Sequence, residues 1–324
     1  MADDGRHDEE PETTPVPDSP GGATREQLAP PAGTRGSRFG LAFAGVVLAA
    51  VAAIVGVVVV STTPTPSSAS SAATATDTTG QGQAALGAQQ PDPVVAPLPV
   101  SDADLAALPQ ATTFGTVANA PHDDNPAAAP SGRLVHPSAT VPVYLAPGDK
   151  AIAALPALQL QSDTWLPVIE EQTGWVRVLL PTRPGGSTGW LYLDDPRVSV
   201  ARTTYRIVVD RAAFTLTLFD GDRQVNRWTV GVGKPNSVTP QGRTFVMASI
   251  KDTHPTFSPI ILPLGTHSDT YTSYGGGPGT VGIHTWPSQD VYGKPSSDGC
   301  IRVPPDALGV LSTQVPIGTP VLIS

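Results

Sequence analysis

YRIVVDRAAFTLTLFDGDRQVNRWTVGVG, residues 205–233, decides the fold of the C-terminal part of the chain. YRIVVD and FTLTLFD are β-type runs, and Gly221-Asp222 forms a tight turn before the third run. TPQGRTFVMASI (239–250) predicts a further strand, and GTPVLIS (318–324) another. One short helix is predicted over residues 304–315, where two prolines precede an acidic first turn. Residues 204–324 are therefore predicted to form a mostly β domain that buries its own core.

A second group of short β-type runs lies upstream and is broken by Pro, Gly and Asp. The runs are VPVYLAPGD (141–149), TWLPVIEEQTGWVRVLLP (164–181) and GWLYLDD (189–195). Several short strands in about 70 residues predict a small barrel over residues 133–200. The pattern resembles bacterial Src-homology-3-like (SH3-like) domains, modules that bind or position. Its tryptophans pack in the core or line a peptide groove: Trp165, Trp175 and Trp190.

The N-terminal part of the chain holds one long apolar segment between polar stretches. LAFAGVVLAAVAAIVGVVVV (41–60) contains no charge and is long enough to span a bilayer as a helix. Arginines precede it and an uncharged stretch follows, so the N-terminus is predicted in the cytoplasm and the C-terminal domains outside. A cleaved signal peptide is the alternative. We therefore expect a disordered cytoplasmic tail (1–38), a single-pass membrane anchor (39–60) and a disordered linker (61–130) spanning roughly 45 Å.

The overall charge argues against one class of partner. The formal net charge is −9 and the isoelectric point is near 5.0, and no basic cluster offsets this acidity. Nucleic acid is therefore excluded as an expected partner.

The chain contains a single cysteine, Cys300, in SSDGCIRV (296–303). It cannot form a disulfide within the chain, and the alternatives are a small buried core residue or a nucleophile. His284 lies upstream in GTVGIHTW (279–286), far enough for a strand, a loop and a return, and a neighbouring imidazole can take the proton of a thiol. Gly299 permits a tight turn whose backbone N–H groups, those of Asp298, Gly299 and Cys300, are candidates for stabilising an oxyanion.

GIH followed by SDGCIRV resembles the signature of the L,D-transpeptidase (YkuD-like) catalytic domain. Further matches lie at 207–219, 230–233 and 239–242, so the resemblance covers nearly all of 204–324. It implies a β-sandwich with one or two short helices, Cys300 as nucleophile and His284 as its base. It also implies that the carbonyl of Thr285 orients the imidazole and that Ser297 and Arg302 shape the donor site.

Two positions depart from the family pattern. Asp298 replaces the usual second histidine, and Thr285 stands where glycine or serine is more frequent. A carboxylate close to a thiol raises the pKa of the thiol. We expect Asp298 on the rim of the cleft, paired with Arg302 or accepting a hydrogen bond from an incoming amine.

The resemblance implies acyl transfer between peptidoglycan stem peptides without a cofactor. Cys300 attacks the bond after the third stem residue and releases D-alanine, and an amine of a neighbouring stem resolves the thioester. Carbapenems are implied as covalent inhibitors. Water as the acceptor makes the enzyme an L,D-carboxypeptidase, and a catalytically weakened, membrane-tethered peptidoglycan-binding protein is a further alternative.

Two other features bear on the site. His254, His267, His284 and Cys300 are widely separated in the sequence and include no close pair, so no metal site is expected. The segment 252–279 is rich in Gly and Pro and directly precedes His284. We expect it to form a lid whose Tyr271 and Tyr274 face the substrate.

Overall fold

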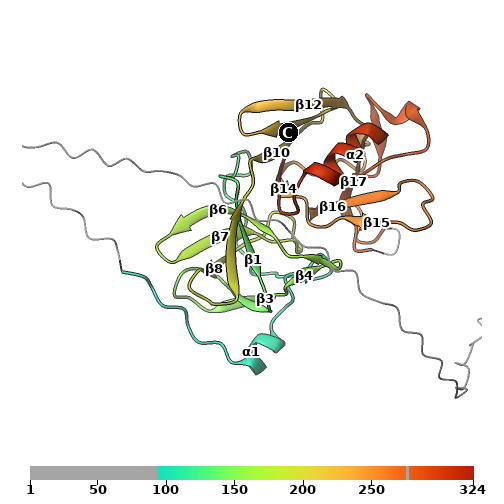
Figure 1. The fold of residues 1–324 in the computed structure, drawn as a ribbon. Coiled ribbons are helices and arrows are strands. Elements are labelled where there is room, and N and C mark those ends of the chain that lie inside the picture. Colours follow the sequence, from blue (N-terminus) through green and yellow to red (C-terminus); the bar gives the residue numbers. More distant parts are fainter. Residues whose placement is uncertain (1–92, 275–276) are drawn as a thin grey trace, which may run out of the picture. The chain divides into compact units, whose positions relative to one another are not determined.

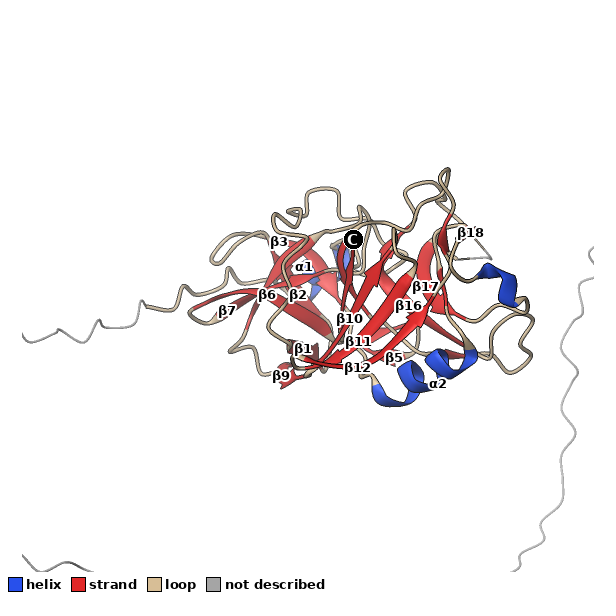
Figure 2. Cartoon of the chain, turned by 90° about the horizontal axis from the view of Figure 1, so that it is seen from above, coloured by secondary structure: helices blue, strands red, loops and turns tan. Residues whose placement is uncertain are grey.

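The computed structural model describes residues 93–274 and 277–324. The predicted cytoplasmic tail (1–38), the predicted anchor (39–60) and the first part of the predicted linker lie outside this range. Within it, every helix is too short or too polar to cross a membrane. The described chain is mostly β, with two short α-helices, which confirms the predicted fold class (Figure 2).

The N-terminal part of the described chain forms a β domain around one antiparallel sheet of seven strands (Figure 1). Its strand order is β3-β2-β8-β7-β6-β1-β9, and the short strands β4 (Leu158–Gln159) and β5 (Ser162–Asp163) pair separately. Buried Val, Leu and Ile side chains fill its interior. The seven strands are β1 (Arg133–Pro137), β2 (Val141–Tyr144), β3 (Ala151–Leu155), β6 (Leu166–Gln172), β7 (Trp175–Leu179), β8 (Thr188–Tyr192) and β9 (Val198–Arg202).

The predicted linker 61–130 is wrong for its last part, because residues 93–130 are folded against the β domain. Helix α1 (Asp102–Ala107) is capped by the side chain of Ser101, and isolated bridges join Gln110, Thr116 and His122 to the β domain. The physical reason is a few apolar anchors, among them Ala111 at 0% exposure and Val117 at 2%. The Pro- and Ala-rich composition conceals these anchors in the sequence.

The C-terminal domain is built from a five-stranded sheet, a four-stranded sheet and the pair β13-β18. The five-stranded order is β12-β11-β10-β20-β14, in which β10 and β20 run parallel. Its strands are β10 (Tyr205–Asp210), β11 (Thr215–Asp220), β12 (Arg223–Thr229), β14 (Gly242–Phe245) and β20 (Pro320–Ile323). The four-stranded sheet contains β15 (Ile250–Lys251), β16 (Ile260–His267), β17 (Thr280–His284) and β19 (Ile301–Arg302). The pair consists of β13 (Val232–Gly233) and β18 (Pro295–Ser297), and the helices are η1 (Gln289–Val291) and α2 (Pro305–Gln314).

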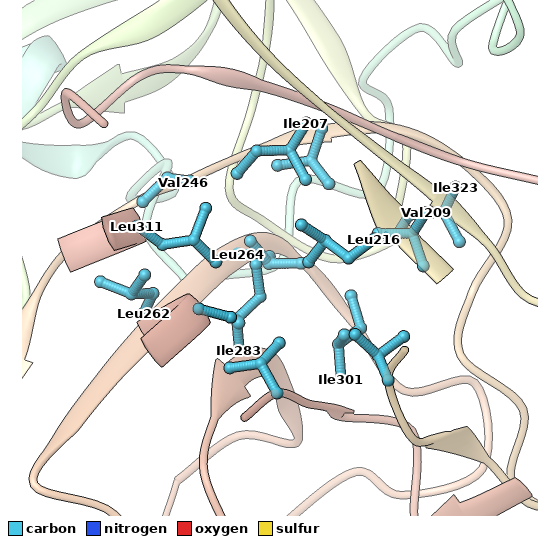
Figure 3. Close-up of a cluster of buried hydrophobic side chains, with 14 of the residues drawn as sticks. Ile207, Val209, Leu216, Val246, Leu262, Leu264, Ile283, Ile301, Leu311 and Ile323 are labelled. Carbon is cyan, nitrogen blue, oxygen red and sulfur yellow. The ribbon is translucent and has the colours of Figure 1, made fainter. Parts of the chain in front are cut away.

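The core of this domain lies between the two larger sheets and helix α2. Figure 3 shows side chains from β10, β11, β16, β17, β19, β20 and α2 directed toward one another. Ile207, Leu216, Leu264, Ile283 and Ile301 are each 0% exposed. Full burial of such a side chain contributes about 1.5–3 kcal/mol. This packing fixes β17 and β19, the two strands that carry the candidate site.

Candidate active site

Strands β17 and β19 bring His284 and Cys300 to one face. The strands pair in parallel with Ile283 opposite Ile301 and His284 opposite Arg302. Ile283 and Ile301 point into the core, so the residues next to them in each strand point to the other side. Cys300 directly precedes β19, and its side chain and that of His284 line the same cleft.

The imidazole of His284 is buried, with one nitrogen already engaged. Its Nδ1 lies 2.7 Å from the carbonyl oxygen of Thr285, and since a carbonyl only accepts, Nδ1 carries the proton. The Nε2 of the neutral ring is then an acceptor. Burial lowers the pKa of His284, the nearby charge of Arg302 lowers it further, and the bond to Thr285 opposes both effects. The ring is thus held neutral and oriented.

Thr285 fixes this arrangement through a neighbouring loop. Its backbone N–H donates to the hydroxyl of Ser258 at 3.0 Å, and that hydroxyl donates to the carbonyl of Ile260 at 2.6 Å. The Thr285 hydroxyl lies 3.0 Å from the same Ser258 oxygen. The residue after His284 is therefore tied to the start of β16, and the threonine found here uses its hydroxyl in that connection.

Cys300 is a half-buried free thiol that lines the cleft. Burial raises its pKa, and the carboxylate of Asp298 adds to this effect. The backbone of Gly282 and the charge of Arg302 lower it. Because burial dominates, the resting thiol is protonated and needs a base to become a nucleophile.

The turn that presents Cys300 is stabilised from inside. Gly299 has φ +118°, a conformation that L side chains rarely adopt. Ser297 donates its hydroxyl to the carbonyl of Cys300 at 2.5 Å and accepts the N–H of Gly299 at 3.2 Å. In the structure, the N–H of Gly299 is therefore engaged inside the turn. The hydroxyl of Thr239 also stabilises the turn, because it donates a hydrogen bond to the carbonyl of Gly299 at 2.8 Å.

The carboxylate of Asp298 lies on the cleft and pairs with a lysine. Its Oδ1 is 3.1 Å from the Nζ of Lys234, and both side chains are partly exposed. The expected partner Arg302 instead donates to the carbonyl of Ser296 at 2.7 Å, and its guanidinium lies 3.7 Å from the ring centre of Trp286. Within the described residues, the buried Nε–H of Arg302 has no acceptor. The Nε–H of Arg302 is therefore available to donate a hydrogen bond to a ligand beside the cleft.

The cleft has about 630 Å³ of open space. Its walls combine the predicted residues Tyr271, Tyr274, His284, Ser297, Asp298, Cys300 and Arg302 with others, among them Phe257, Ser268, Thr280 and Trp286. Phe257 contacts His284 edge-on, with ring centres 5.0 Å apart. Phe257 and Trp286 therefore form an aromatic wall beside the imidazole, with ring centres 5.0 and 6.2 Å from that of His284.

Comparison with known families decides the assignment of the domain. Residues 204–323 match the family model of the L,D-transpeptidase catalytic domain. The C-terminal domain belongs to the L,D-transpeptidase family. Curated protein sequences give no significant match.

Solved L,D-transpeptidases are similar to this chain over part of its length. The enzyme from Mycobacterium smegmatis shares 17% identity over 46% of this chain and 90% of its own, with a TM-score of 0.33. LdtMt1 in complex with imipenem shares 16% identity over 60% and 82%, with a TM-score of 0.35. The Enterococcus faecium catalytic domain acylated by ertapenem shares 25% identity over 38% and 99%, with a TM-score of 0.30. With scores this low, the family match alone carries the assignment.

The expected lid of the L,D-transpeptidase domain is not one continuous loop. Strand β16 occupies its middle, so two separate loops reach the cleft, one with Phe257 and one with Tyr271 and Tyr274. His254 is exposed on the first loop, and His267 is buried with its Nε2 2.7 Å from the carbonyl of Thr113.

The loop that carries the two tyrosines is held by the β domain. Arg183 donates to three backbone carbonyls of this loop: Ser268 at 3.4 Å, Tyr271 at 3.0 Å and Pro278 at 2.8 Å. A second link joins the hydroxyls of Thr113 and Thr280 at 2.5 Å. The L,D-transpeptidase cleft therefore depends on contacts from outside its own domain.

Sequence reasoning missed several of these residues. Trp286 had a signal, because it follows His284 by two positions in the same motif. Lys234 and Arg183 had none, since they lie 64 residues before Asp298 and 88 residues before Tyr271.

Proposed function

We propose that the protein is a peptidoglycan L,D-transpeptidase that cross-links stem peptides through a thioester on Cys300. The observation that carries the proposal is the common cleft of Cys300 and His284, in which the Thr285 carbonyl holds the proton on Nδ1. A neutral imidazole with a free Nε2 is the base that a thiol of raised pKa requires.

In the first half-reaction, Nε2 of His284 accepts the thiol proton while Sγ of Cys300 attacks the carbonyl carbon of the third stem residue. The tetrahedral intermediate then expels the amine of D-alanine, and His284 returns the proton to that amine. The C–N bond is replaced by a C–S bond, and D-alanine leaves. The N–H groups of Cys300 and Asp298 are the donors that we assign to the oxyanion, because Gly299 is bonded to Ser297.

In the second half-reaction, an amine on a neighbouring stem attacks the thioester and His284 accepts its proton. A new amide links two diaminopimelate residues, and the proton returns to the Cys300 thiolate. Asp298 lies on the cleft and attracts a cationic acceptor, while Lys234 neutralises part of its charge. With water as acceptor, the same steps give an L,D-carboxypeptidase.

The proposal places the catalytic domain on the outer side of the cell membrane. A helix over residues 39–60 anchors the chain, and residues 1–38 lie in the cytoplasm. Segment 61–92 gives the folded part its reach toward the cell wall. No cofactor takes part, and carbapenems are covalent inhibitors.

Mass spectrometry after incubation with a carbapenem tests the nucleophile, by analogy with the ertapenem-acylated Enterococcus faecium domain. The wild-type chain should gain one adduct, and Cys300→Ala should gain none. An adduct on Cys300→Ala would refute the assignment of the nucleophile. No adduct on the wild-type chain would favour the weakened peptidoglycan-binding protein instead. Incubation with a tetrapeptide donor and an amine acceptor then separates transpeptidation from hydrolysis.

A further inference from the structure

A proline-containing segment, residues 93–100 (PVVAPLPV), lies against an aromatic cluster of the β domain. The cluster consists of Tyr144, Trp175 and Trp190, with Tyr192 packed beside it. The indole N–H of Trp175 donates to the carbonyl of Val95 at 2.7 Å. The hydroxyl of Tyr144 donates to the carbonyl of Leu98 at 3.3 Å. Two aromatic side chains thus bind the backbone of the segment directly.

The segment is stiffened by its own sequence. The rings of Pro97 and Pro99 fix the φ angle of each residue, and each proline restricts the residue before it to extended or polyproline II conformations. No residue of 93–100 belongs to a helix or strand. A polyproline II segment makes no internal hydrogen bonds, so its carbonyls are free to accept bonds from aromatic donors.

Two glycines make room for the segment. A Cβ at Gly148 would lie 2.6 Å from Cγ1 of Val95, and one at Gly174 would lie 2.5 Å from Cγ1 of Val94. Any larger residue at either position would collide with a valine. The aromatic cluster and the two glycines, together called the aromatic groove, therefore contact both the backbone carbonyls and the valine side chains of the segment.

The contact nevertheless leaves much of the segment exposed. Val94, Val95 and Leu98 are 44%, 52% and 48% exposed, and their side chains are not part of the buried clusters. The segment pairs with no strand of the sheet. Only Val100, at the end of the segment, packs partly buried against the cluster. A segment held by two side-chain donors and a few half-exposed apolar groups can open locally without global unfolding.

We propose that this aromatic groove is a binding site for proline-rich peptides in the polyproline II conformation, and that residues 93–100 are its resident ligand. Release of residues 93–100 adds them to the predicted linker that precedes them and frees the groove for a proline-rich segment of a partner. The inference is independent of the chemistry at Cys300.

The test uses the full chain and a labelled peptide, PVVAPLPVS. A tethered ligand competes at an effective concentration on the order of millimolar, so the wild-type groove resists the peptide. The double variant Val94→Asp/Val95→Asp should weaken the resident segment and bind the peptide at least about tenfold more tightly than wild type. Val200→Asp is the matched control, because Val200 on β9 is also 44% exposed and lies outside the segment. It should behave like wild type.

A third change tests the assigned donor. Adding Trp175→Phe to the double variant keeps an aromatic ring and removes the indole N–H. Peptide affinity should fall roughly tenfold, the effect of one lost buried hydrogen bond. Unchanged affinity would overturn the role of the Trp175–Val95 bond.

Hydrogen exchange of the wild-type Trp175 indole N–H keeps the proposal testable if the variants do not fold. A releasable segment should let this proton exchange at least about 100-fold faster than the core amides of β7. Exchange at the same rate as those amides would mean that the segment is a fixed part of the fold. A second outcome would also overturn the proposal: the double variant folds and its Trp175 indole proton loses protection, but the variant does not bind the peptide.

Discussion

Replacing Arg183 with alanine should impair the active site from a distance. Its guanidinium donates to the carbonyls of Tyr271 and Pro278 at 3.0 and 2.8 Å, with a weaker third bond to Ser268 at 3.4 Å. A hydrogen bond from a charged group contributes about 1.5–3 kcal/mol. Arg183 is only half-buried, so we take the lower value for the two short bonds and reduce their sum to roughly 2 kcal/mol for solvent screening.

That energy sets an upper limit on the kinetic effect. If the whole of it holds Tyr271 and Tyr274 in the cleft wall, Arg183→Ala lowers the second-order rate constant of carbapenem acylation by up to about 30-fold. Stopped-flow fluorescence measures that constant, and hydrogen exchange reports on the loop around Tyr271. Arg183→Lys should recover part of the loss, since the lysine ammonium can replace one of the three hydrogen bonds of the guanidinium but not all of them.

A matched control separates this effect from damage to the β domain. Arg197 is also part-buried, but its bonds to Asp195 and Thr140 stay within the β domain. Arg197→Ala should leave acylation within about twofold of wild type, well below the 30-fold limit. Acylation by Arg183→Ala within twofold of wild type, with unchanged exchange around Tyr271, would refute the reasoning. Equal losses in the two variants would refute it as well.

The remaining predictions concern the catalytic groups. His284→Ala should slow acylation by about 10²–10⁴-fold, the usual effect of losing a general base, and a near-normal rate would mean that another group takes the proton. Because burial lowers the pKa of His284, its neutral form persists below pH 6.5, so the acid limb of the acylation profile should have its midpoint below that value; a midpoint above it would contradict the burial argument. Asp298→Asn should keep carbapenem acylation within about tenfold but slow transfer to an amine acceptor more severely, which separate measurements of the two half-reactions would show. Lys234→Met should raise the thiol pKa of Cys300, measured by the pH dependence of alkylation, and should have little effect when Asp298 is already Asn.

The sequence predicted those parts of the fold and site that depend on local pattern. The β-type runs from Tyr205 onward appear as strands, since their apolar residues form the core, and the motif residues His284 and Cys300 lie together because β17 and β19 pair in parallel. What it missed depends on distant contacts. The buried residues Ala111 and Val117 do not belong to a periodic pattern of apolar residues, so the sequence around them resembles a linker. The bond between the Gly299 N–H and the Ser297 hydroxyl depends on the geometry of the turn, which the sequence does not reveal.

The position of β20 in its sheet determines when the active site can form during synthesis. Ile207 of β10 pairs with Val321 of β20, and β20 also pairs with β14, so this strand closes the sheet between two segments made much earlier. A nascent chain that has been synthesised just past Cys300 contains the proposed nucleophile but lacks Val321 and Ile323, which belong to the buried core. Pairings between such distant residues form slowly because a long loop must close first. Cys300 is therefore synthesised before the proposed active site is complete, and an incompletely synthesised chain carries the cysteine without that site.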